Sequence, residues 1–167
     1  KNIEYFFDCS SPWTYLSFRG ILELRDKKEF EIIWKPILVG GIFNSINPSV
    51  YESRKNPVEE KLKYSQKDLK DWAKLRNLEI NWPKIFPINS VKAMRGAFHF
   101  IERNTLEVYL ESVFSGYWTH RKDISNIDTL LQIVNKIGED QEQYLEVVNS
   151  EEAKQKLIEN TQELMER

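Results

Sequence analysis

The chain opens with an alternation of side chains that predicts a β-strand leading into a helix. Ile3, Tyr5 and Phe7 share one face of an extended segment, and aromatic and branched side chains favour a pleated, half-buried surface. After a break at residues 10–12, apolar residues return at helical spacing, and a second alternating segment follows at 30–34. A strand, a helix and a strand in this order predict a right-handed crossover with two parallel strands.

Helical periodicity predominates in the rest of the chain. After Pro36 we expect an apolar loop over residues 37–43 and a polar loop over residues 44–48. A lysine-rich amphipathic helix should begin near Pro57 and end before residue 77. Further helices are predicted over residues 90–103, 106–114, about 125–137, 141–148 and 151–166. The helix near 125 has a possible capping box at residues 125–128 and should end at Gly138.

Ser11 stands where the first strand ends and the first helix begins. A serine can cap the first free backbone N–H groups, and Pro12 fits the first helical position, where a missing N–H costs nothing. The positive end of the helix dipole at this junction favours an anion. From these residues alone, simple helix capping and anion binding both remain open.

Composition excludes several classes of function. The chain has 167 residues, 41% hydrophobic content and a net charge of −2, which predicts one domain or two small ones and offers no basic face for nucleic acid. No segment is apolar enough to span a membrane. Cys9 is the only cysteine, so neither an intrachain disulfide nor a cysteine-based metal site can form. We therefore expect no metal, and a soluble protein in the reducing cytoplasm.

The motif Phe7-Asp8-x-x-Ser11-Pro12-Trp13-Thr14-Tyr15-Leu16 resembles the opening motif of 2-hydroxychromene-2-carboxylate isomerases and kappa-class glutathione transferases. These families form the glutathione-using branch of the DsbA-like thioredoxin superfamily. The resemblance implies an α/β, thioredoxin-like fold with a large helical insertion. Redox members carry cysteines in this frame, whereas residues 11 and 14 here are Ser and Thr, so dithiol–disulfide exchange through the motif is chemically excluded.

The resemblance extends over nearly the whole chain. It implies an N-terminal βαβ half at residues 1–40, an inserted helical domain at 41–137 and returning helices at 138–167. In the family two antiparallel strands follow the last helix, and an isolated two-stranded sheet is marginal in water. We therefore expect that the family's C-terminal strands are missing from this chain.

The same resemblance implies a glutathione site. Ser11 matches the serine that stabilises the thiolate, with Pro12 beside it, while Asn47 and Lys61 match residues that hold the polar ends of glutathione. The thiolate would add reversibly to a conjugated aromatic substrate and so permit isomerisation. The partners implied are a small aromatic carboxylate or electrophile and a second copy of the chain in a homodimer.

The predicted substrate pocket lies between the thioredoxin-like half and the inserted helices. Phe43, Trp82 and Trp118 are expected to form its walls, and Lys35, Asn89 and Arg95 are candidates to hold the substrate carboxylate. Arg95 could equally form a helix salt bridge. We expect His99 to be a structural histidine and Cys9 to be a buried thiol, although glutathionylation of Cys9 is conceivable.

Three classes of function stay open at this point. The first is a glutathione-dependent isomerase or a kappa-class-like transferase. The second is a DsbA-like oxidoreductase, against which Ser11 and Thr14 argue. The third is a non-catalytic binding protein that retains the fold.

Overall fold

The N-terminal part of the fold, up to Pro36, is a parallel crossover unit, as predicted. The computed structural model describes residues 1–167. Strand β1 (Asn2–Phe7), helix α1 (Pro12–Lys28) and strand β2 (Glu31–Pro36) follow one another, and the two strands pair in parallel with Asn2 opposite Glu31 and Phe7 opposite Pro36. These two strands form the entire sheet of the described chain. The prediction of two strands is therefore confirmed.

Aromatic packing fixes α1 against one face of the sheet. The ring centroids of Phe18 on α1 and Trp34 on β2 are 6.1 Å apart, and Trp34 meets Tyr5 and Phe7 edge-on at 5.6 and 6.0 Å. Side chains on a strand alternate between faces, so these three strand residues share the face that α1 covers. Lys35 lies on the other face, where helix α9 (Glu151–Glu166) packs against the sheet.

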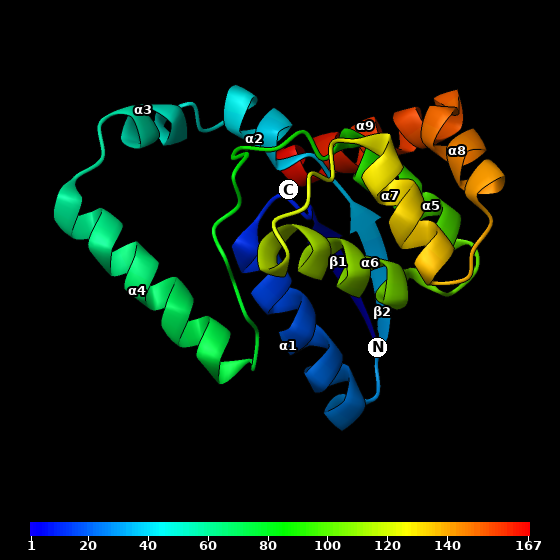
Figure 1. Ribbon diagram of the computed structural model, residues 1–167, viewed down its shortest axis with the longest axis horizontal. Helices are drawn as coiled ribbons and strands as arrows, with labels where there is room; N and C mark the ends of the chain where they lie inside the picture. Colours follow the sequence, from blue (N-terminus) through cyan, green and yellow to red (C-terminus); the bar gives the residue numbers. More distant parts are fainter.

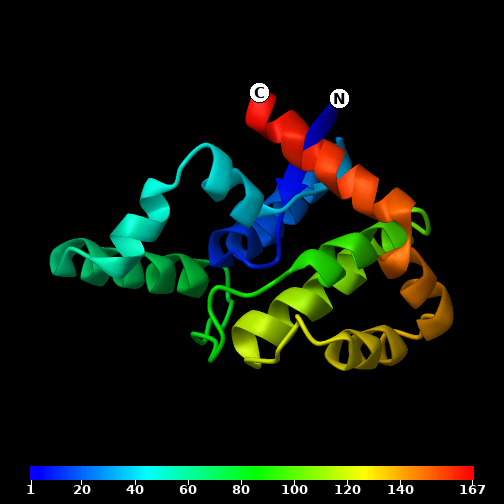
Figure 2. The same ribbon diagram turned by 90° about the horizontal axis from the view of Figure 1, so that it is seen from above.

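A chain segment after β2 forms an arm that extends from one side of the molecule (Figures 1 and 2). It contains helices α2 (Val39–Ser45), α3 (Ser49–Lys55) and α4 (Glu59–Leu75). The prediction of an uninterrupted loop over 37–48 was wrong in part, since α2 forms there, and α3 was not predicted. Only Leu69 and Ala73 of the arm helices are buried, in a small cluster with Leu16 of α1.

The remaining helices build the main core beside the sheet. They are α5 (Val91–Ile101), α6 (Leu106–Phe114), the π-helical turn η1 (Ser115–Thr119), α7 (Ile127–Lys136), α8 (Gln141–Asn149) and α9. Together with β1 and α1 they form one cluster of 25 buried residues. The predicted helices 106–114 and 151–166 are confirmed at both ends.

Two details of the helix ends test the predicted capping signals. Gly138 has a left-handed backbone (φ 80°) and follows the end of α7, as its position in the sequence indicated. The start of α7 differs from prediction: Asn126, not Ser125, caps the helix by accepting a hydrogen bond from Asp128 N. Ser125 instead donates from its backbone N–H to Asp123 Oδ1 at 3.0 Å.

None of the helices combines the length and the apolar character that a membrane-spanning helix requires.

Candidate active site at the start of helix α1

Ser11 is the N-cap of α1, and Pro12 occupies the first helical position. The Ser11 Oγ accepts a hydrogen bond from Thr14 N at 3.3 Å, and the serine is half-buried. Because the Oγ is the acceptor in this bond, its own hydrogen is free to be donated outward. The backbone N–H of Trp13 forms no hydrogen bond. One hydroxyl donor and one amide donor are thus left at the positive end of a 17-residue helix.

Asp8 is a buried carboxylate that fixes the turn before Ser11, a role that sequence reasoning did not assign to it. Its Oδ1 accepts from Ser10 N and its Oδ2 from Val39 N, both at 2.9 Å, while its backbone carbonyl accepts from Ser11 N at 3.2 Å. Burial raises the pKa of Asp8, although these N–H donors and Ser90 oppose the rise. The carboxylate therefore joins the Ser11 turn to the first residue of α2.

The π-helical turn η1 supports the same junction from behind. Trp118 Nε1 donates to the carbonyl of Cys9 at 2.9 Å, and the Trp118 side chain is completely buried. The wide turn is closed by a hydrogen bond from His120 N to Ser115 O, five residues back. Trp118 was predicted to line a substrate pocket. Because its side chain is completely buried, it can support such a pocket from behind but cannot form its surface.

Trp118 belongs to a set of neighbouring side chains that we call the aromatic group. We use this term for Phe43, Trp82, Phe86 and Trp118. The Trp82 ring is 4.8 Å from Phe86 and 5.8 Å from Trp118, between centroids, and Trp82 is 53% exposed. The sequence predicted Phe43, Trp82 and Trp118 as walls of one pocket and missed Phe86. Ring contacts join Trp82, Phe86 and Trp118, whereas Phe43 is linked to them through Arg54. Trp118 also bonds to Cys9, two residues before Ser11, so this buried ring connects the exposed Trp82 to the Ser11 turn.

Arg54 of α3 joins the aromatic group, and sequence reasoning did not single it out. Its guanidinium carbon lies 5.2 Å from the centroid of Phe86, 5.7 Å from Phe43 and 5.8 Å from Tyr51. These distances are within the range of cation–π attraction. The contact links Phe43 of α2 to Phe86, whose segment is 43 residues further along the chain. Nothing in the local pattern of α3 indicated this arrangement.

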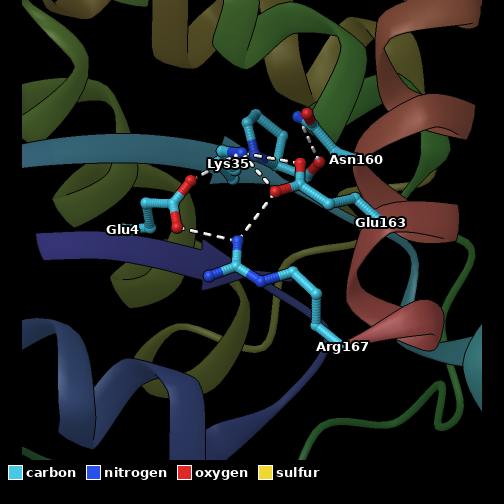
Figure 3. A network of polar contacts seen from close by, with 6 residues as sticks. Glu4, Lys35, Asn160, Glu163 and Arg167 are labelled. Carbon is cyan, nitrogen blue, oxygen red and sulfur yellow. Dashed lines mark hydrogen bonds and ion pairs between the residues drawn. The ribbon is translucent and has the colours of Figure 1, made fainter.

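Lys35 is bound in a network of ions on the other face of the sheet (Figure 3). Its Nζ lies 2.8 Å from Glu4 and 2.6 Å from Glu163, and Arg167 contacts the same two carboxylates at 2.7 and 2.8 Å. The four side chains form a closed ring of alternating charge, which we call the charge ring. Its two carboxylates satisfy the Lys35 ammonium, so Lys35 does not enter our proposal as a carboxylate-binding residue.

Arg95 is likewise directed into the helical core. Its Nη1 donates to the carbonyl of Val148 near the end of α8 at 3.4 Å, and its buried Nε forms no hydrogen bond. The salt bridge that the sequence left open as an alternative for Arg95 is not formed, because its guanidinium bonds to the Val148 carbonyl and no carboxylate lies within 4 Å of it. The guanidinium instead serves a free carbonyl at a helix end.

The other predicted site residues lie at exposed positions. Asn89 is exposed, and its Oδ1 accepts a hydrogen bond from Val91 N at 3.0 Å. The next residue, Ser90, is one of the groups that oppose the rise in the pKa of Asp8. Asn47 accepts from the Ser49 hydroxyl at the start of α3. Lys61 is exposed in the first turns of α4 and forms no hydrogen bond or ion pair. No contact joins Asn47 or Lys61 to Ser11, so their glutathione-binding roles stay predictions.

Cys9 and His99 are both fully buried. Burial raises the pKa of the Cys9 thiol well above its usual value, and the Asp8 charge adds to the rise. Such a thiol is unreactive, so the structure does not favour glutathionylation. His99 Nδ1 meets Arg103 at 3.2 Å, but its Nε2 lacks a hydrogen bond and lies 3.6 Å from Glu139. No group of His, Cys, Asp and Glu side chains could hold a metal ion.

The fold and the strand-to-helix junction agree with the family comparison. Residues 2–167 match the DsbA-like thioredoxin domain, so the chain belongs to that family. It is 25% identical to the 2-hydroxychromene-2-carboxylate isomerase of Pseudomonas sp. (strain C18), over 99% of this chain and 76% of the relative. It is also 27% identical to glutathione s-transferase kappa 2 of Caenorhabditis elegans, over 98% of this chain and 75% of the relative.

Solved structures confirm the fold. A 2-hydroxychromene-2-carboxylate isomerase structure matches 99% of this chain and 80% of its own with a TM-score of 0.79 and 20% identity. A putative protein disulfide isomerase from Nitrosomonas europaea matches 99% and 78% of the two chains with a TM-score of 0.72 and 14% identity. The predicted DsbA-like, thioredoxin-like fold is therefore confirmed. Both of the curated relatives carry the names of enzymes.

Proposed function

We propose that the protein is a glutathione-dependent isomerase of the 2-hydroxychromene-2-carboxylate isomerase type. The observation that carries the proposal is the Ser11 hydroxyl at the start of α1, which already accepts from Thr14 N and so has its hydrogen free. The similarity to an enzyme of that name supports the choice of reaction. The absence of sulfur at residues 11 and 14 argues against redox chemistry at the same position.

The donors at the junction fit a thiolate. A free thiol has a pKa near ~8.5, so little of it is ionised at neutral pH without stabilisation. Ser11 would donate its O–H to the sulfur, and the unpaired Trp13 N–H and the helix dipole would add positive potential. Pro12 contributes no N–H but fixes the backbone in the helical conformation. Asn47 and Lys61 are proposed, on the resemblance alone, to hold the polar ends of glutathione.

When bound, glutathione supplies a thiolate that can add reversibly to a conjugated double bond, which permits rotation about that bond. The chain's own residues orient the reactants. The exposed side of Trp82, with Phe86, offers an apolar aromatic surface for an aromatic substrate, and the buried Trp118 connects it to the Ser11 turn. Asn89, exposed next to Ser90, is a candidate hydrogen-bond donor to a polar group of the substrate.

A kappa-class-like glutathione transferase is the second candidate, because one curated relative carries that name. The two activities need the same stabilised thiolate and differ in the product. An isomerase returns glutathione unchanged, whereas a transferase consumes one molecule for each product formed. Mass spectrometry of the product with an unsaturated aromatic ketone would therefore distinguish the two.

Glutathione binding tests the proposal most directly. We expect wild-type protein to bind glutathione in calorimetry and to show ultraviolet thiolate absorbance near neutral pH. The Ser11→Ala variant should lose this absorbance and about 100-fold in activity, since a positioned donor to a developing anion contributes on that order. It should also lose about 1 kcal/mol of stability, because the helix loses its cap.

Ser11→Asp is the matched control that separates these two losses. Aspartate caps helices as well as serine does, so the free energy of unfolding should return to that of wild type. Its negative charge opposes a neighbouring thiolate, so the absorbance should stay absent. If wild-type protein does not bind glutathione, or if Ser11→Ala leaves both absorbance and activity intact, the proposed function is wrong.

A further inference from the structure

We propose that Arg54 is the residue that binds the carboxylate of the substrate. This inference rests on the proposed function and adds a specificity residue to it. The sequence offered Lys35, Asn89 and Arg95 for this task. The structure engages Lys35 in the charge ring and Arg95 at the end of α8, while it places an unassigned cation against the aromatic group.

The charge of Arg54 has no acidic partner. Five of the other arginines lie within 4 Å of a carboxylate: Arg19, Arg25, Arg76, Arg103 and Arg167. Arg54 forms no ion pair and no hydrogen bond, and it is exposed. Its contacts are instead with the rings of Phe43, Tyr51 and Phe86. A guanidinium held by rings in this way keeps its N–H groups available, and their fork geometry matches a carboxylate.

The position of Arg54 defines the shape of the ligand. Phe86 stands between Arg54 and Trp82, with its ring 4.8 Å from Trp82 and 5.2 Å from the Arg54 guanidinium. Trp82 in turn is 5.8 Å from Trp118, which bonds to the Cys9 carbonyl beside the Ser11 turn. The cation, the rings of Phe86 and Trp82, and the buried Trp118 that bonds to the Ser11 turn thus form one chain of contacts. A ligand with a carboxylate at one end of a conjugated aromatic system matches this order.

The test compares an acid with its amide. Cinnamate and cinnamamide share one planar conjugated skeleton and differ in charge, and calorimetry would measure the binding of each to wild type, Arg54→Gln and Lys55→Gln. Lys55 is the adjacent residue of α3 and forms no ion pair, so Lys55→Gln removes the same charge without touching the aromatic group. We expect Arg54→Gln to weaken cinnamate binding at least ~10-fold, as expected for loss of a charge-assisted bidentate contact. Lys55→Gln should leave it within ~2-fold, since a solvated surface charge contributes little.

Cinnamamide binding should be equal in wild type and Arg54→Gln, which also shows that the aromatic group is intact in the variant. Equal cinnamate binding by wild type and Arg54→Gln, or no cinnamate binding by wild type, would overturn the inference.

Glutathione itself carries carboxylates, so its affinity is measured in parallel. An Arg54→Gln variant that loses glutathione affinity but keeps cinnamate affinity would show that Arg54 holds glutathione and not the substrate. If wild-type protein with glutathione shows no thiolate absorbance, the proposed function is wrong. That absorbance is measured without cinnamate, so this result does not depend on cinnamate binding. The two failures are therefore distinguishable.

Discussion

The helical core and the arm differ in how many of their side chains are buried. Seven of the eleven residues of α5 are buried, whereas only two of the seventeen residues of α4 are, and α2 and α3 bury none. The core is held by packing, whereas the arm is held by a few contacts, such as Val39 N with Asp8 and Arg54 with its rings. The candidate site lies where the two meet. Its Ser11 side should therefore be rigid and its Arg54 side adaptable.

A pair of glycine substitutions should break this contrast most strongly. A methyl group added at Gly96 of α5 would come within 2.3–2.5 Å of the Tyr144 ring, which is buried and hydrogen-bonded to Tyr109. We expect Gly96→Ala to cost about 3 kcal/mol of stability, because a packed core yields little to added volume. Chemical denaturation monitored by circular dichroism would measure it.

Gly40→Ala in α2 is the matched substitution in the arm. A methyl group there meets nothing within 4 Å, and alanine favours a helix by up to about 1 kcal/mol over glycine. This variant should be as stable as wild type or more so. Equal destabilisation by both substitutions would contradict the distinction between a packed core and a loosely attached arm.

Leu69→Ala sharpens the comparison within the arm. Leu69 is one of the two buried residues of α4 and packs with Leu16 and Ala73, apart from the main core. We expect a cost of about 2 kcal/mol, confined to the docking of α4. Hydrogen exchange should accelerate over residues 59–75 while the protection of α5 is retained. Leu62→Ala, at an exposed position of the same helix, is the control and should change neither. Uniform loss of protection would show that arm and core unfold together.

The smallest expected effect is a pH dependence of the core through His99. Burial, with the Arg103 charge, lowers the pKa of His99, and the facing Glu139 and Glu102 oppose this. Below pH 6.5 the unfolded chain therefore binds the proton first, so stability is complete above that pH and falls as the pH drops toward 5. The slope should stay under about 1.4 kcal/mol per pH unit, the limit for one proton.

Thermal unfolding of wild type and His99→Gln between pH 7.5 and 5 would measure this dependence. The variant should lose the part of the slope that His99 contributes in that window, in which the carboxylates with lowered pKa values do not yet titrate. Asp8, whose pKa is raised by burial, would contribute a slope of the opposite sign in both proteins. His120→Gln is the control, because that histidine lies outside the core and should leave the slope unchanged. A slope that persists in His99→Gln would assign the effect to another group.

The periodicity of hydrophobic residues predicted those helices and strands that depend mainly on their own local sequence. The strands, α1 and the helices from α5 to α9 have clear periodicity, and Ser11 was identified as a cap from its neighbours alone. Helix α2 was missed because Gly40 and Gly41 disfavour a helix, and its first N–H is held by Asp8, 31 residues earlier. The turn η1 was missed for a similar reason: Trp118 bonds to Cys9, 109 residues away.

Charged residues at the site were the least predictable. Lys35 and Arg95 read as cations available to a ligand, but their partners Glu163 and Val148 lie far along the chain. Arg54 showed no signal in the sequence, because only the folded arm brings it to Phe86. The division into domains at residues 40 and 137 and the homodimer stay predictions.

Helix α9 is attached to the rest of the fold by two kinds of contact, the ion pairs of the charge ring and neutral hydrogen bonds, which respond differently to ionic strength. Near its end, Glu163 and Arg167 reach Glu4 and Lys35 through partly exposed ion pairs, which dissolved salt screens. One turn earlier, Asn160 donates to the Pro36 carbonyl and Thr161 accepts from Leu38 N, both neutral contacts that salt hardly affects. Concentrated salt should therefore fray the last turn of α9 and leave the rest of the helix seated on the sheet.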